Sequence, residues 1–179
     1  MMKTIRTIAL VGAALVVATV RPAAAQSASL QGDLLKDWTN MKTTMTKIAD
    51  AMPEDKYGFK PTPAQRSFGE QMMHVAGANM GLIKALGSKA TPPAVNMKAT
   101  TKADIVKALA ESYDYGIAAI KEQTDQTMME TVQGPPFMGP STRARIVYAT
   151  IGHAWDEYGV VTTYLRLNGI IPPASRGSM

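Results

Sequence analysis

The chain has 179 residues, 19 basic and 14 acidic side chains, a formal net charge of +5 at pH 7 and no cysteine. The absence of cysteine excludes disulfides, thiolate metal ligands and a lipid-anchored cysteine. The charge is modest and its lysines and arginines form no stripe, so we expect no nucleic-acid partner.

The first 25 residues have the pattern of a secretory signal peptide. Lys3 and Arg6 precede an apolar run over 8–20, and three alanines end at Ala25. A charged start, a short apolar run and small residues before the cut are typical of such signals, and this run is too short to stay in a membrane as a spanning helix. We expect cleavage after Ala25, or alternatively after Ala28, and export to the periplasm or the exterior with no membrane attachment. The three basic residues of the signal leave with it, so the mature domain over 26–179 keeps 16 basic against 14 acidic residues.

The first half of the mature chain contains two predicted helices. Residues 30–52 place Leu, Trp, Met and Ile at helical spacing, and Pro53 ends the run. The second helix opens at Ser67 with Glu70 three residues later, a capping box, and closes near Gly87. Residues 89–100 form a linker.

The second half contains two more. A helix is predicted over about 101–120, followed by a loop rich in glycine and proline, and then one from Ser141 to about Asn168, where Pro172 follows. No segment of strand length alternates apolar and polar residues. Four amphipathic helices with no strands predict an all-α fold, a four-helix up-and-down-type bundle.

Both histidines lie on predicted helices. His153 and Glu157 are four residues apart, so they project from one face of the last helix. That face is otherwise apolar, and a carboxylate there is costly unless it is paired or bound to a metal. His74 lies on the second helix, where Glu70 and Gln71 are candidates to support a site from one turn away. If the two helices face each other, His74, His153 and Glu157 form a divalent metal site.

Two imidazoles and a carboxylate suit zinc, and they also suit iron, nickel or manganese. The alternative is that both histidines are ordinary buried residues and that Glu157 pairs with one of them or with an arginine. The 13 methionines raise a second alternative, copper binding through Met72 and Met73 next to His74. Helical spacing instead favours a core role for most of the methionines, and we expect the two tryptophans to be packing residues. Tyr164 is a candidate acid near the site, although a core tyrosine is the simpler interpretation.

Three segments resemble the DinB-like superfamily of four-helix bundles. They are Tyr57-Gly58-Phe59-Lys60-Pro61 through Glu70, Met73-His74-Val75-Ala76, and His153 through Gly159 followed by Tyr164 to Pro173. The resemblance implies a metal held by one histidine of the second helix and an H-x3-H pair of the fourth. His74 and His153 match this pattern, whereas Glu157 stands where the family usually has histidine, and Val160 follows Gly159 where glutamine is common.

The resemblance further implies a metal-dependent enzyme related to thiol transferases, acting on a small molecule. Hydrolysis through metal-bound water suits an exported protein better, because low-molecular-weight thiols are chiefly cytoplasmic. One alternative is a non-catalytic helical module that binds a metal or small ligand at a degenerate site. Another is a structural homodimer joined through helix faces.

Overall fold

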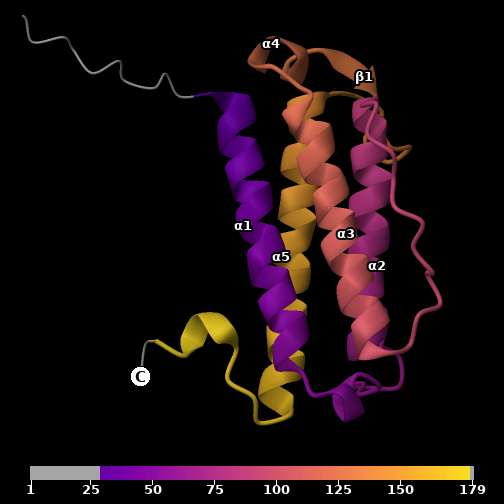
Figure 1. Ribbon diagram of the computed structural model, residues 1–179, viewed down its shortest axis with the longest axis vertical. Helices are drawn as coiled ribbons and strands as arrows, with labels where there is room; N and C mark the ends of the chain where they lie inside the picture. The colour runs from indigo at the N-terminus through magenta and orange to yellow at the C-terminus, as the bar shows by residue number, and fades with distance from the viewer. Residues whose placement is uncertain (1–28, 178–179) are drawn as a thin grey trace, which may run out of the picture.

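The computed structural model describes residues 29–177 (Figure 1). The predicted signal peptide over 1–25 lies outside the described residues. Four long helices confirm the all-α, four-helix bundle: α1 (Leu30–Ala51), α2 (Phe68–Ile83), α3 (Lys102–Lys121) and α5 (Arg143–Leu167). Within residues 29–177, no helix combines the length and apolar character that crossing a membrane requires.

Shorter elements join the long helices. Three 3-10 turns, η1 (Glu54–Lys56), η2 (Lys84–Leu86) and η3 (Pro173–Ser175), follow α1, α2 and α5 respectively. The predicted loop before α5 contains a one-turn helix, α4 (Asp125–Met128), and two antiparallel strands, β1 (Thr131–Gln133) and β2 (Pro140–Thr142). These strands have three residues each, too few for an alternating pattern that would predict them from the sequence.

Each long helix begins at a hydroxyl cap. The side chains of Ser29, Ser67, Thr101 and Thr142 each accept a hydrogen bond from the backbone N–H three residues later. At α2 the capping box predicted from the sequence is complete, because Glu70 also accepts a hydrogen bond of 2.6 Å from the backbone N–H of Ser67. These caps fix where α2 and α5 start.

The helices pack so that α1 and α2 each contact both α3 and α5. Figure 1 shows the segment from Gly87 to Thr101 running back along the outside of the bundle, so that α3 starts at the same end as α2 and runs in the same direction. Fifteen extended residues can span about 50 Å, more than the length of α2, so the linker is long enough for this return. The segment therefore lies beside α2 along much of its length.

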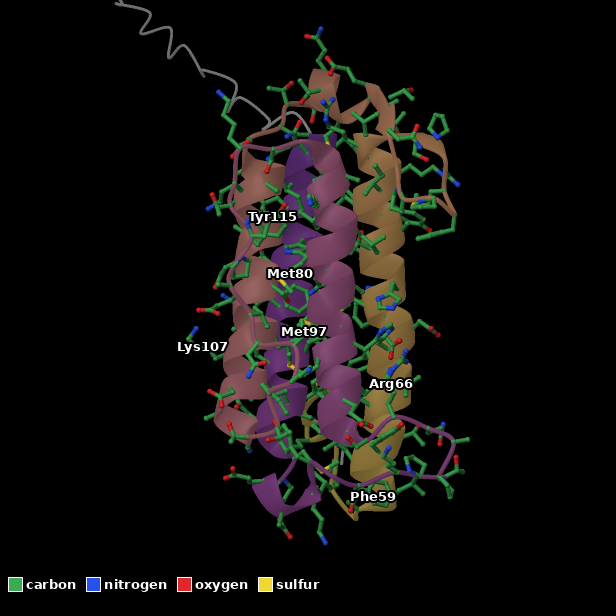
Figure 2. The ribbon with its side chains drawn as sticks, turned by 90° about the vertical axis from the view of Figure 1, so that its right-hand side faces the viewer. Phe59, Arg66, Met80, Met97, Lys107 and Tyr115 are labelled. Atoms are coloured by element: carbon green, nitrogen blue, oxygen red, sulfur yellow. The ribbon has the colours of Figure 1, made fainter. Side chains whose placement is uncertain are left out.

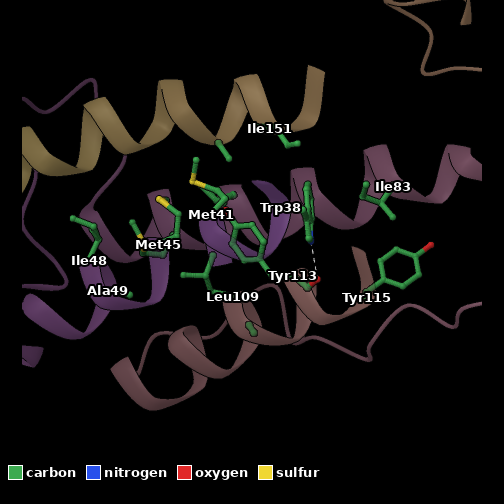
Figure 3. Close-up of a cluster of buried hydrophobic side chains, with 14 of the residues drawn as sticks. Trp38, Met41, Met45, Ile48, Ala49, Ile83, Leu109, Tyr113, Tyr115 and Ile151 are labelled. Carbon is green, nitrogen blue, oxygen red and sulfur yellow. Dashed lines mark hydrogen bonds between the residues drawn. The ribbon is translucent and has the colours of Figure 1, made fainter. Parts of the chain in front are cut away.

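Trp38 lies at the centre of the core, fully buried between α1 and α3 (Figure 3). Its indole N–H donates a hydrogen bond of 2.8 Å to the backbone carbonyl of Tyr113. The indole ring lies so close to Gly116 on α3 that a Cβ atom added at this position would overlap it. Met41, Met45 and Met52 are buried in the same core, which confirms their interpretation as packing residues.

The second tryptophan does not belong to this core. Trp155 is 53% exposed on the outer face of α5, where its ring meets Tyr158 edge to face. The expectation that Trp155 is a packing residue like Trp38 was wrong, because more than half of its surface is exposed.

The contact between Trp38 and Gly116 generates a test of the core. Gly116→Ala should lower the free energy of unfolding by about 1–3 kcal/mol, because the new methyl group overlaps the buried indole. Gly152→Ala is the matched control in α5, where nothing lies near an added methyl group, and should raise stability by up to about 1 kcal/mol. Urea unfolding followed by circular dichroism measures both. Equal effects of the two substitutions would contradict the packing described here.

Candidate metal centre

The contact between α2 and α5 brings three side chains together. His74 comes from the second turn of α2, and His153 and Glu157 from successive turns of α5. The Nε2 atoms of the two histidines are 3.2 Å apart. Oε1 of Glu157 lies 3.3 Å from Nε2 of His74 and 3.5 Å from Nε2 of His153. The three residues singled out from the sequence therefore meet at one point.

The three atoms form a group that could hold a metal ion. Ligands of a tetrahedral zinc ion at bond lengths of about 2.0–2.1 Å lie about 3.3 Å from one another. The observed separations of 3.2, 3.3 and 3.5 Å fit three corners of such a tetrahedron. The donor set of two nitrogens and one oxygen also suits zinc and other divalent ions, so the residues present fit the group that the family pattern implies.

Burial keeps the two histidines in the neutral state that metal binding requires. Desolvation lowers the pKa of His74 and of His153, which keeps both imidazoles neutral at pH 7. Burial also raises the pKa of Glu157, whose side chain is only 8% exposed. Without a cation, the lone pairs of two imidazole nitrogens and a carboxylate oxygen face one another, with few hydrogen-bond donors between them. A positive charge at their centre would relieve that conflict.

Gln71 supports the carboxylate from the preceding turn of α2. Its side-chain amide donates a hydrogen bond to Oε2 of Glu157, which leaves Oε1 directed at the histidines. This contact confirms the prediction that Gln71 supports the site by holding one of its candidate ligands. Glu70 does not reach it, because its carboxylate caps α2 and lies 3.1 Å from Lys60.

Tyr164 is buried one turn beyond Val160 on α5. Its hydroxyl donates a hydrogen bond of 2.8 Å to the backbone carbonyl of Arg66. The phenol therefore serves the core and the loop before α2, as the simpler interpretation of this tyrosine predicted. Met72 and Met73 are buried in the hydrophobic core, in agreement with a packing role for these methionines.

Two cavities lie beside the three residues. One, of about 670 Å³, lies over α2 between the segment 63–66 and the linker residues 97–100, and His74 lines it. The other, of about 560 Å³, lies between the same segment and α5, and Glu157, Gln71 and Tyr164 line it. Arg66 lines both, and Figure 2 shows it beside α5. The sequence analysis did not single out Arg66, because helical periodicity cannot place the side chain of a residue in an irregular loop.

Comparison with known proteins gives the family. The model of the DinB superfamily matches residues 38–161, which include all three candidate ligands. The chain belongs to the DinB superfamily. A crystal structure of a DinB-like protein from Bacillus cereus has a TM-score of 0.70 with this chain at 18% identity, and the match covers 79% of this chain and 95% of that one. At this identity the likeness shows the fold alone. No curated protein matches the chain.

The raised pKa of Glu157 generates a test on the metal-free protein. Because the folded state holds this proton more tightly than the unfolded state does, the stabilisation it gives is present below about pH 4 and lost as the pH rises through the raised pKa. Glu157→Gln removes this loss, so the free energy of unfolding of the variant minus that of the wild type should increase between about pH 4 and pH 7.

Urea unfolding in the presence of EDTA measures this difference across the pH range. Glu54→Gln is the control, because Glu54 is exposed in η1 and away from the site. A difference for Glu157→Gln that is flat or decreases with pH would show that the buried carboxylate carries no such cost.

Proposed function

We propose that this protein is an exported metal-dependent enzyme of the DinB superfamily. In it His74, His153 and Glu157 hold a divalent ion, zinc, nickel, manganese or iron. The observation that supports this best is the triangle of two imidazole nitrogens and one carboxylate oxygen with sides of 3.2–3.5 Å. Three protein ligands leave a coordination position for a water molecule or a substrate, as in catalytic rather than structural zinc sites.

An ion bound there would supply Lewis-acid chemistry, lowering the pKa of a water or thiol ligand so that it becomes a nucleophile near neutral pH. The residues of the chain supply orientation. Gln71 fixes one carboxylate oxygen of Glu157, and the packing of α2 on α5 holds both imidazoles at their spacing. Because the chain has no cysteine, a thiol would have to arrive with the substrate. Hydrolysis requires no such partner and suits an exported protein, so we favour a hydrolase over a thiol transferase.

A second candidate is a non-catalytic module that binds a metal or small ligand. The carboxylates in and near the site support this alternative. Both oxygens of Glu157 have partners, and Glu70 is bound to Lys60 and to the backbone of Ser67. Within residues 29–177, neither cavity is lined by a further carboxylate that could act as a general base.

Metal uptake tests the proposal directly. After dialysis against zinc, nickel, manganese and iron, we expect mass spectrometry to find close to one ion per wild-type chain. His153→Ala should lower the affinity by more than about 100-fold, since even residues that only support metal ligands contribute about 10- to 100-fold. Tyr148→Ala is the control, because this tyrosine is exposed on α5.

A wild-type protein that takes up none of these ions would overturn the proposal. If an ion binds, a panel of ester, amide and thiol-transfer substrates separates the two candidates. The enzyme should show turnover that His153→Ala loses, whereas a binding module should show none in either protein.

Export is a separate part of the proposal. The full chain expressed in a bacterial host should be recovered outside the cytoplasm with an N-terminus at Gln26, or at Ser29 if cleavage follows Ala28. Leu15→Arg places a charge inside the apolar run and should leave the protein uncleaved in the cytoplasm. Cell fractionation and N-terminal sequencing measure the outcome, and an uncleaved cytoplasmic wild type would contradict it.

A further inference from the structure

The cavity over α2 has a positive lining. Lys60, Arg66 and Lys98 line it together with a single carboxylate, that of Glu70. Lys60 lies 3.1 Å from Glu70, so these two charges offset each other. Arg66 and Lys98 form no salt bridge with any residue in 29–177. Two positively charged residues without a salt-bridge partner among residues 29–177 therefore line a cavity whose wall includes His74.

The backbone at Arg66 is held in place. Its carbonyl accepts the hydrogen bond from the buried hydroxyl of Tyr164, and the next residue, Ser67, is the cap of α2. The residue thus lies between two fixed points, one on α5 and one on α2. Arg66 as a whole, in contrast, is exposed and lines both cavities. A planar group with five N–H donors at such a place is suited to binding a carboxylate or a phosphate.

The position of Arg66 conflicts with the proposed metal ion unless something lies between them. Arg66 lines both the cavity that His74 borders and the cavity that Glu157 borders, so its charge lies close to candidate ligands from α2 and from α5. A positive charge close to the site repels a divalent cation bound there. An anion next to both charges turns this repulsion into attraction.

We infer that the cavity over α2 binds a small organic anion beside the candidate metal centre, with Arg66 and Lys98 bound to its carboxylate or phosphate group. This inference rests on the proposed function and adds the substrate class to it. The volume of about 670 Å³ lies within the range of small-molecule pockets, about 300–1,000 Å³. The substrate is then an acid or a phosphate ester whose reactive part lies near His74.

Cobalt(II) is the probe ion for the test, and malonate and inorganic phosphate are the probe anions. Cobalt affinity is measured by competition with a chelator. Anion affinity is measured by calorimetry on the cobalt-loaded protein, at constant ionic strength set with chloride. Arg66→Ala is compared with Arg166→Ala, which removes the same charge from an exposed position near the end of α5 that lines neither cavity.

We expect Arg66→Ala to bind at least one of the two anions about tenfold more weakly than the wild type, as the loss of one charge-assisted contact predicts. Its cobalt affinity should be equal to or higher than that of the wild type, because a repulsive charge is gone. Arg166→Ala should match the wild type in both measurements. The anion that responds identifies the carboxylate or the phosphate as the recognised group.

Failure of the inference and failure of the proposed function have different signatures. Cobalt uptake without anion binding, or an equal response of Arg66→Ala and Arg166→Ala, overturns the anion site and leaves the metal site intact. No cobalt uptake by the wild type overturns both.

Discussion

Three atoms with lone pairs meet within 3.5 Å of one another between α2 and α5, and much of what is unusual about this bundle follows from that meeting. Two neutral imidazoles and a buried carboxylate offer too few hydrogen-bond donors for the three lone-pair atoms that meet here. An apolar contact between these helices would avoid this cost, because a buried charge costs free energy unless it is paired. The chain keeps the costly arrangement, and such a departure from simple packing is expected at a functional site.

The rest of the fold makes this convergence rigid. The three side chains stand on long helices rather than on loops, and sites on such elements hold their geometry better than sites on loops do. On the far side, Trp38 packs against Gly116 and bonds to the backbone at Tyr113, which locks α1 onto α3. The irregular parts of the chain lie at the edge of the bundle. The segment before α2 and the returning linker form the walls of the cavities, and they bring the positive charges of Arg66 and Lys98.

Much of this could be predicted from the sequence, because the signals were local. The capping box at Ser67 and the four apolar spacings placed the helices to within a few residues, and Glu157 on an apolar face pointed to a site. Other features gave no local signal. Arg66 follows no periodicity, the strands are three residues long, and Glu70 serves its own helix rather than the site. Trp155 was misjudged because a large apolar side chain on a helix does not reveal whether a neighbour covers it.

The sequence by itself determined that the chain is helical, where each helix starts, and that His153 and Glu157 share one face, since all of these depend on residues within one or two turns. Only the tertiary structure decided that α5 lies against α2. The local sequence of the linker from Gly87 to Thr101 does not determine whether it runs back along the bundle or crosses its end. That choice depends on which apolar faces fill the shared core best. The same choice brought His74, 79 residues before His153, to within 3.2 Å of it.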